Sequence, residues 1–240
     1  MRILRQFQTP PHPCPYLPDR EARLEYLYTP RLTGAEYERL MDRGYRKFGP
    51  LPFHPVCPHC TACRPIRIPL DAFRPDRSQR RNWKRNQDLE VRCAEPSLDE
   101  DRLALYHRYH AAQTERKDWP PSSTDGSDYT FSFLSNSVPA QEITLWLEGR
   151  LVAVVLTELT PRVISGVYHY HEPELAERGL GVYGMLQTLE LGRRLDKKWA
   201  YFGYYVAGCP SLEYKARFRP CELMDEQGIW RPFPDPVPNQ

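Results

Sequence analysis

The sequence predicts an α+β protein in two parts: an irregular, cysteine-bearing N-terminal domain at residues 1–95, and a domain at residues 96–240 with a mixed, mainly antiparallel sheet. Three observations predict this organisation. Prolines cluster at residues 10–18 and 50–75 and limit regular structure there. A polar, proline-bearing stretch near residues 94–99 marks the boundary. Beyond it, apolar runs with strand and helix periodicity follow the order β-β-β-α-β.

The composition is that of a folded globular protein, with 40% hydrophobic and 27% charged residues. The N-terminus has charge and proline where a secretory signal needs an apolar stretch, and the longest aliphatic run extends only from Leu151 to Leu156. We therefore expect a cytoplasmic protein that does not associate with a membrane. Seven cysteines, three of them closely spaced, favour a reducing compartment over paired disulfides. The net charge is +2, so nucleic-acid binding would need a local basic patch.

Three helices are expected before the strands. Residues 34–45 follow Thr33, a typical N-cap residue, and the helix should end before Gly44. A second helix is expected at residues 78–88, and a third at residues 101–115, where apolar side chains recur at helical spacing.

A β-hairpin, a third strand, a helix and a last strand are expected to follow. Glu148-Gly149-Arg150 separates two β-rich apolar runs, which is typical of an antiparallel hairpin with a short turn. An amphipathic helix follows Gly181 and buries one apolar face. The four strands are expected at residues 143–147, 151–159, 162–170 and 199–206.

Three thiols lie close together at Cys57-x-x-Cys60-x-x-Cys63. Thiolates at this spacing can converge on a soft metal if a fourth ligand arrives from elsewhere, and Cys14 is the natural candidate. The spacing occurs in both zinc and iron–sulfur sites. The alternative is a set of reduced thiols that pack or sense redox state. Two histidines could replace a cysteine ligand: His54 and His59.

The helix expected at residues 78–88 and the turn before it are strongly basic. Like charges at helical spacing repel one another unless an anion meets them, and arginine binds phosphate bidentately. A solvated charged face is the usual explanation of a basic run, but this density favours nucleic acid. Trp83 could stack on a base or anchor the helix to the core. The cations are Arg74, Arg77, Arg80, Arg81, Lys84 and Arg85, against the single acid Asp76.

A glycine turn, Arg178-Gly179-Leu180-Gly181, is expected between the third strand and the amphipathic helix. Backbone N–H groups at such a turn can converge on an anion at the positive end of the helix dipole. Many such turns only reverse the chain. The β-β-β-α-β order with this turn is nevertheless how acyl-CoA N-acyltransferases of the GNAT type hold a pyrophosphate, and the second domain resembles that fold.

Two tyrosines lie at the end of the last expected strand, and a lysine follows it: Tyr204, Tyr205 and Lys215. An acyltransferase could place a general acid or a carboxylate clamp there, although these side chains could also be half-buried packing residues. A second aromatic and imidazole group lies at residues 168–171, where strand alternation lets only two of the four side chains face one side.

Six motifs in order resemble one family, the bacterial aspartate/glutamate leucyltransferases, which are relatives of the eukaryotic arginyl-tRNA–protein transferases. The similarity covers almost the whole chain, and several independent motifs are more specific than any single one. The motifs are PHPCPYLPDR, CPHCTAC, RSQRRNWKRNQDLEV, the Leu180-Gly181-x-Tyr183 turn, FGYYVAGC and EYKARFRP.

The resemblance implies that the GNAT-like domain binds the end of an aminoacyl-tRNA and transfers leucine to proteins that begin with Asp or Glu. It also implies a role in the N-degron pathway, where the added leucine marks the acceptor for degradation. In eukaryotic relatives the N-terminal cysteines are linked to an iron–sulfur cluster or haem, which points to Cys14, Cys57, Cys60 and Cys63. This chain departs from the family pattern by carrying Pro210-Ser211-Leu212-Glu213 where the family has basic residues, which does not favour tRNA contacts there.

Roles can be assigned as hypotheses on this basis. The donor is an activated ester, so transfer requires neither ATP nor another cofactor, and it depends on positioning and on stabilising an oxyanion. A cationic pocket for the acidic acceptor residue could be formed by Arg77, Arg80, Lys215 and Arg217. The predicted catalytic residues are Tyr204, Tyr205 and Lys215; the predicted tRNA contacts are Arg77, Arg80, Arg81, Lys84, Arg85, Gly179 and Gly181; the predicted acceptor contacts are Tyr168, Tyr170 and Arg217.

Other functions stay open on the sequence. A GNAT-type N-acetyltransferase would bind acetyl-CoA, but it would leave the basic helix unexplained. A non-catalytic protein with a zinc-bound module would bind RNA and catalyse nothing. Arginine in place of leucine as the transferred residue also stays open.

Overall fold

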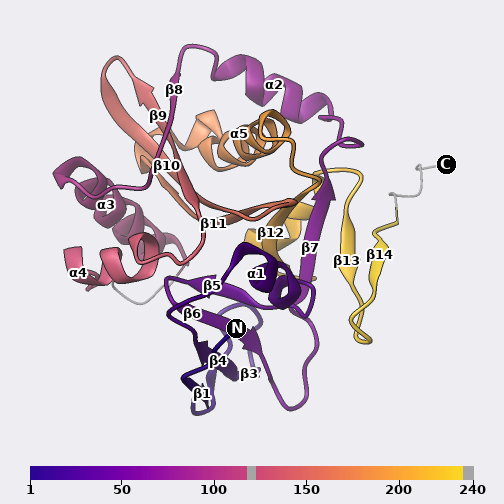
Figure 1. Cartoon of the computed structure of the whole chain (residues 1–240). Coiled ribbons are helices and arrows are strands. Elements are labelled where there is room, and N and C mark those ends of the chain that lie inside the picture. Colours follow the sequence, from indigo (N-terminus) through magenta and orange to yellow (C-terminus); the bar gives the residue numbers. More distant parts are fainter. Residues whose placement is uncertain (118–122, 235–240) are drawn as a thin grey trace.

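The computed structural model describes residues 1–117 and 123–234, and an eight-stranded sheet runs through it (Figure 1). Neighbouring strands of this sheet are antiparallel except for one parallel pair, β11 and β12. The predicted α+β class with a mixed, mainly antiparallel sheet is therefore confirmed. In spatial order the strands are β14 (Trp230–Pro232), β13 (Glu222–Met224), β7 (Arg64–Pro69), β12 (Trp199–Tyr205), β11 (Val163–His171), β10 (Arg150–Leu159), β9 (Ala140–Leu147) and β8 (Glu90–Ala94).

The N-terminal part is not irregular as the prolines suggested, because it forms two further small sheets. Prolines do not exclude strands here: Pro13, Pro55 and Pro69 each occupy the last position of a strand, and Pro52 and Pro65 each occupy the second. The four-stranded sheet is β1 (Arg5–Gln8), β4 (Leu24–Tyr28), β6 (Leu51–Pro55) and β5 (Arg46–Phe48), and the two-stranded sheet is β2 (His12–Pro13) and β3 (Glu21–Ala22).

The expected helices form, and two of them carry capping boxes. Thr33 accepts from the backbone of Glu36 at the start of α1, and Asp76 accepts from that of Gln79 at the start of α2. Within the described part of the chain, no helix has the length and apolarity needed to cross a membrane. The helices are α1 (Gly34–Met41), α2 (Arg77–Arg85), α3 (Glu100–Lys117), α4 (Gly126–Tyr129), α5 (Leu180–Arg194) and α6 (Pro210–Glu213), with helical turns η1 (Thr130–Leu134), η2 (Pro173–Arg178) and η3 (Tyr214–Arg217).

The predicted β-β-β-α-β order is confirmed in β9, β10, β11, α5 and β12. Glu148 and Gly149 both have positive φ, 50° and 80°, which matches the twist of a tight hairpin turn between β9 and β10. The crossover through α5 brings β12 parallel to β11. Because α5 connects these two parallel strands, it begins beside the C-terminal ends of β11 and β12.

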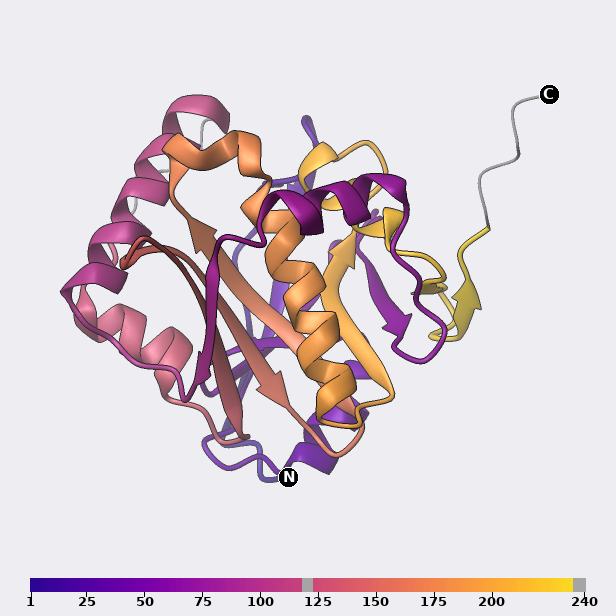
Figure 2. The ribbon, with the colours of Figure 1, turned by 90° about the horizontal axis from the view of Figure 1, so that it is seen from above.

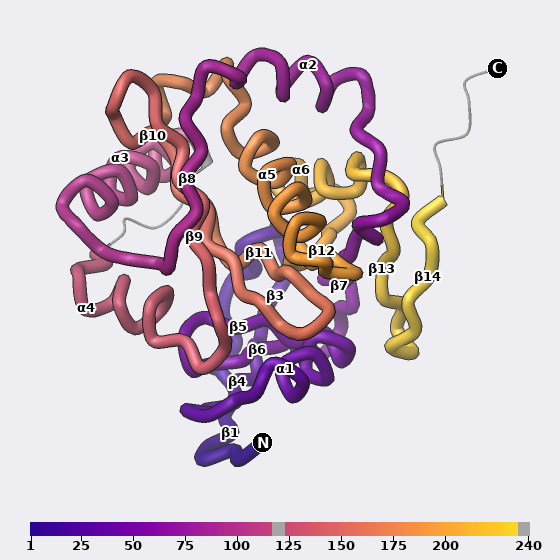
Figure 3. Tube along the Cα trace, turned by 45° about the horizontal axis from the view of Figure 1, so that its top comes forward, coloured from indigo at the N-terminus to yellow at the C-terminus, as the bar shows by residue number. Residues whose placement is uncertain are grey.

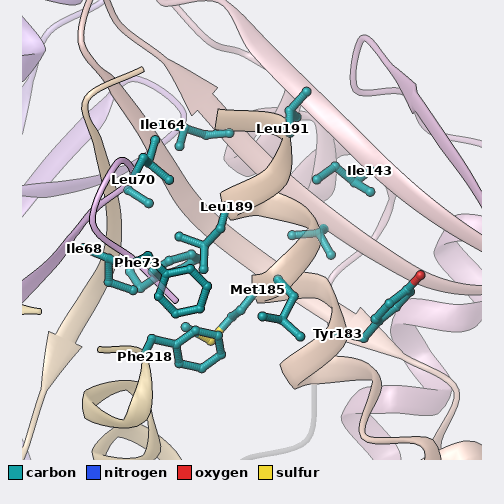
Figure 4. Packing of buried hydrophobic residues seen from close by; sticks show 14 of the residues in the cluster. Ile68, Leu70, Phe73, Ile143, Ile164, Tyr183, Met185, Leu189, Leu191 and Phe218 are labelled. Atoms are coloured by element: carbon teal, nitrogen blue, oxygen red, sulfur yellow. The ribbon is translucent and has the colours of Figure 1, made fainter. Parts of the chain in front are cut away.

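One face of the large sheet is covered by α5, and α2 lies across α5 (Figures 2 and 3). The core between this helix and the sheet is aliphatic and aromatic, with Ile164 of β11 and Leu189 of α5 buried in it (Figure 4). The other face is covered by α1 and the N-terminal sheet, with α3 beside them (Figure 1).

The predicted boundary at residues 95 and 96 falls between β8 and α3. On its N-terminal side, β7 pairs with β12 and β8 pairs with β9, so the two predicted domains share one sheet. A buried ion pair between Lys47 of β5 and Glu158 of β10 also joins them. Asn136 accepts a further hydrogen bond from the same ammonium, at 3.0 Å.

Candidate active site

A cavity of about 670 Å³, here called the splay cavity, opens where β11 and β12 separate. The two strands pair only from Val163–Trp199 to Ser165–Tyr201, although both continue beyond that point. Gly166 follows the last pair, and a Cβ there would lie 3.0 Å from the Phe202 ring. The lining residues come from β10, β11, β12, α3, α5, the turn before α5 and the segment after β12, together with Tyr16 and Phe48 from the N-terminal part.

The glycine turn forms one side of the splay cavity, where Gly179 and Gly181 line it. The first N–H groups of a helix have no partner inside the helix, so α5 begins with free donors beside the cavity. The turn is held by the basic helix: Asn82 Nδ2 donates to the carbonyls of Arg178 (2.9 Å) and Gly179 (3.1 Å). Trp83 packs edge-on against Tyr183 at 5.5 Å, so this tryptophan anchors α2 to α5.

The exposed face of α2 is a cluster of cations beside that turn. Within residues 1–117 and 123–234, none of them forms an ion pair with a carboxylate, and none lines the splay cavity. Arg80 and Arg85 donate only to backbone carbonyls, those of Pro75 and Glu177. The surface is therefore available to an anion such as a nucleic-acid phosphate. Its members are Arg77, Arg80, Arg81, Lys84 and Arg85.

Lys215 is the only lysine or arginine among the described residues that line the splay cavity. Its Nζ donates to the carbonyl of Tyr204 at 3.1 Å. Burial, together with the nearby positive charge of Arg46, lowers the pKa of Lys215 to about 7. The amine is therefore poised to gain or lose a proton near neutral pH.

Alternation on β11 separates the tyrosines from the histidines at residues 168–171. His169 and His171 lie near Gly181, and burial lowers the pKa of His171 to about 4, so its imidazole is neutral. Tyr168 lines the splay cavity, with its hydroxyl 2.8 Å from His110 Nε2. Tyr170 is fully buried, with its hydroxyl 2.8 Å from that of Tyr129. The predicted acceptor contact at Tyr170 is thus replaced by core packing.

Three other predicted residues do not line the splay cavity. Tyr204 donates from its hydroxyl to the carbonyl of Gly44 at 2.8 Å and faces a different cavity. Tyr205 packs against Phe233 at 5.3 Å. Arg217 is exposed, and its carbonyl accepts from Gln79 of α2. Of the three predicted catalytic side chains, the structure therefore brings only Lys215 to this cavity.

A second cavity of about 760 Å³, here called the cysteine cavity, gathers all four predicted metal ligands. Burial, reinforced by neighbouring thiols, raises the pKa of the Cys63 thiol to about 12. Cys57 instead exchanges weak hydrogen bonds with the backbone of Arg23. The donors thus suit a soft metal, but across the described residues no three Cys, His, Asp or Glu side chains stand in a metal-binding arrangement. The four cysteines are Cys14, Cys57, Cys60 and Cys63.

Several lining residues carry no periodic or motif signal that assigns them to the site. Phe48 and Tyr109 come from β5 and α3, and only the folded chain brings them to β11. Tyr16 lines both cavities, and its position within the PHPCPYLPDR motif is the one signal that could have singled it out.

Two family models match the chain in order. Residues 12–81 match the model described as arginine-tRNA-protein transferase, N terminus, and residues 101–225 match the corresponding C terminus model. The second match alone spans more than half of the chain.

Curated relatives cover nearly the full length. The aspartate/glutamate leucyltransferase of Halorhodospira halophila is 37% identical over 222 residues, which are 92% of this chain and 93% of that protein. The protein of the same name from Stenotrophomonas maltophilia is 38% identical over 241 residues, covering 97% and 94%.

Similarity to solved structures concerns the fold alone. The crystal structure of FemX superposes with a TM-score of 0.50 at 10% identity, covering 76% of this chain and 64% of that one. Matches along the two halves, and relatives above 30% identity over almost the whole length, establish the family. This chain belongs to the arginine-tRNA-protein transferase family, among relatives named aspartate/glutamate leucyltransferases.

Proposed function

We propose that this enzyme transfers leucine from leucyl-tRNA to the N-terminal amine of proteins that begin with Asp or Glu. The names of its curated relatives support this aminoacyltransferase activity. The order β9-β10-β11-α5-β12, with a glycine turn before the helix, supports a GNAT-like acyltransferase fold. Transfer takes place in the cytoplasm, where charged tRNA is used, and the added leucine marks the acceptor for degradation in the N-degron pathway.

The observation that carries leucine as the donor residue is the lining of the splay cavity. No Asp or Glu occurs among the described residues that line it, whereas several apolar side chains do. If the donor residue were arginine, its guanidinium would be buried in this cavity without a carboxylate partner, which is costly. A leucine side chain instead gains free energy from an apolar site. The apolar members include Val155, Val167, Val182, Met185 and Leu212.

The tRNA end approaches along α2 and the start of α5. The cationic face of α2 contacts backbone phosphates, and the free N–H groups beside Gly179 and Gly181 receive an anionic or polar group near the 3′ end. Because Asn82 ties the helix to the turn, both contacts keep a fixed spacing. This arrangement explains why a basic helix lies next to an acyltransferase cavity.

The chemistry is aminolysis of an ester. The acceptor's amine nitrogen attacks the leucyl carbonyl carbon, a C–N bond forms, and the C–O bond to the tRNA ribose breaks. Lys215 accepts the proton that the amine loses and returns it to the departing ribose oxygen. Its lowered pKa suits both steps. Tyr168, which lines the same cavity, helps to position the acceptor.

Incubation with radiolabelled leucyl- or arginyl-tRNA and peptides beginning with Asp, Asn or Lys tests the proposal. We expect leucine to be transferred and the Asp peptide to be preferred. Transfer of arginine instead would support a second candidate, arginyl transfer, which the names of both family models favour. Lys215→Met should lower kcat with Asp and Asn peptides alike. Loss of only the Asp preference would mean that Lys215 binds the acceptor carboxylate and moves no proton.

We also propose that the cysteine cavity holds zinc or an iron–sulfur cluster on Cys14, Cys57, Cys60 and Cys63, with no part in the chemical step. Binding would need the thiolates to move inward, and a cation would relieve their mutual repulsion. Protein purified without oxygen should contain zinc or iron, and Cys60→Ala should lower that content. Cys93→Ala, at an exposed cysteine outside the cavity, should not. Wild-type protein without either metal would refute the assignment.

A further inference from the structure

The wall between the two cavities is a bulge in β12. Gly203 has a φ of 68°, which glycine adopts freely and other residues rarely do. The pairing of β12 with β7 shifts register between Tyr201 and Tyr204, as expected for a bulge. Gly203 lines the splay cavity, whereas Tyr204 lines the cysteine cavity. The backbone here is therefore shared by both sites.

Two cations hold consecutive carbonyl groups of this bulge. Arg46 Nη2, from β5, donates to the carbonyl of Gly203 at 3.0 Å. Lys215 Nζ, from η3, donates to the carbonyl of Tyr204 at 3.1 Å. A Cβ added at Gly203 would lie 3.7 Å from that same Nζ. The position of Lys215 therefore depends on how the bulge is held.

The guanidinium of Arg46 is buried and, among the described residues, forms no direct salt bridge. The residue is 5% exposed, its guanidinium carbon lies 5.1 Å from the Tyr201 ring and 5.8 Å from the Tyr204 ring, and its buried Nε has no hydrogen-bond partner. Glu158 pairs directly with Lys47, and the positive charge of Arg46 favours the same carboxylate only from a greater distance. Burying a charge without a direct ion pair is costly, and packing alone would be served better by a neutral side chain. A functional use of the charge accounts for this cost.

We propose that Arg46 is a positioning residue for transfer: it holds the Gly203 carbonyl of the β12 bulge and thereby seats Lys215 Nζ in the splay cavity. This inference rests on the proposed function and on the role of Lys215 in it. Arg46 itself lines neither cavity, so it acts through the bulge and through its charge.

The charge of Arg46 also opposes protonation of Lys215, since like charges repel. Cys209, after β12, acts in the opposite direction when its thiol ionises. No carboxylate is present among the described lining residues. The other titratable groups that line the splay cavity are Tyr16, Tyr109 from α3, Tyr168, His169 and His171 from β11, and Tyr214 beside the lysine.

The test is the pH dependence of kcat/KM for leucine transfer by the full chain, in wild type, Arg46→Met and Arg46→Lys. Arg46→Met removes the positive charge that disfavours protonated Lys215. The acid limb of the kcat/KM profile should therefore move to higher pH by about one unit. Arg46→Lys keeps the charge and should leave the acid limb near its wild-type pH. Its kcat should be lower, because the ammonium cannot reproduce the planar guanidinium that holds the Gly203 carbonyl.

The matched control is Arg67→Met. Arg67 also lies over aromatic rings, those of Trp199 and Trp230, but it is paired with Glu222 and lines neither cavity. This variant should lose stability while its acid limb stays in place. An acid limb that does not move in Arg46→Met would overturn the proposal.

A second measurement does not depend on transfer. The rate at which an amine-reactive reagent labels Lys215 in the folded protein, followed by mass spectrometry against pH, reports the lysine's protonation directly. The midpoint should rise in Arg46→Met and not in Arg67→Met. If Arg46→Met fails to fold, Arg46→Gln replaces it, and an unchanged midpoint there would overturn the proposal. Wild-type protein that transfers no leucine would instead refute the proposed function.

Discussion

Asn82 Nδ2 lies 3.1 Å from the carbonyl oxygen of Gly179, so a residue of the basic helix holds the turn from which α5 begins. Asn86, one helical turn later, donates to the carbonyl of Arg178 at 3.0 Å. Two features that look independent in the sequence are thus one structural unit.

Gly179→Ala should destabilise the protein more than Gly149→Ala. Both glycines have positive φ, 64° and 80°, which costs an alanine about 1–2 kcal/mol. A Cβ at Gly179 would also lie 2.7 Å from Asn82 Nδ2, whereas one at Gly149 meets nothing within 4 Å. Denaturant unfolding measures both. Adding Asn82→Ala should remove the excess loss, and equal losses in the two single variants would show that the turn adjusts freely.

Replacing Arg80, Arg81 and Lys84 together with alanine should weaken binding of leucyl-tRNA. Each lost phosphate contact should reduce the slope of log affinity against log salt by about 0.7–0.9. Transfer at saturating tRNA should change little, because none of the three lines the splay cavity. Arg39→Ala is the control, since Arg39 is an exposed cation of α1, on the opposite side of the sheet. An unchanged salt slope in the triple variant would place the tRNA elsewhere.

Lys215→Met should change how stability depends on pH. The folded pKa of Lys215, about 7, is below its ordinary value of 10.5, so between these values the unfolded chain binds more protons. Wild-type stability should therefore rise with pH across this window, and the burial penalty should be greatest below it. The free energy of unfolding of Lys215→Met should exceed that of wild type most at low pH. This difference should shrink as the pH approaches 10.5. A gap independent of pH, in thermal unfolding, would contradict the lowered pKa.

Breaking the buried pair of Lys47 and Glu158 should be costly. Lys47→Met leaves the buried carboxylate of Glu158 without its ion-pair partner, and we expect a loss of about 3–5 kcal/mol. Burial already raises the pKa of Glu158, and without Lys47 this carboxyl should become neutral more readily, which limits the loss at low pH. The double variant Lys47→Met with Glu158→Leu should recover part of it. Arg92→Ala, in an exposed pair with Glu90, should cost little in the same unfolding assay.

Local signals in the sequence predicted many of the elements. Thr33 caps the start of α1, and Glu148 with Gly149 forms the turn of the β9–β10 hairpin, because capping and turn geometry depend on a few adjacent residues. The cationic face of α2 and the glycine turn could also be predicted, since helical spacing and the position of glycine are local features of the sequence. Their joining through Asn82 was not.

The position of each tyrosine depended on contacts far along the chain. Tyr170 and Tyr205 were predicted to be site residues because both lie near the ends of strands. In the structure Tyr170 packs with Tyr129, and Tyr205 packs with Phe233. In the same way, proline content predicted an irregular N-terminus, although its short strands gain hydrogen-bond partners from strands up to about thirty positions away, as in the pairing of β4 with β6.

What the sequence by itself determined is the set of parts: the family motifs, the order β-β-β-α-β, the basic helix, the glycine turn and the four cysteines. Only the tertiary structure decided which of them meet. It inserts β7 beside β12, ends the β11–β12 pairing at Ser165, and places Arg46 against the carbonyl of Gly203. The physical reason is that helix capping and turns are fixed by neighbouring residues, whereas cavities and pKa shifts arise from burial among residues distant in sequence.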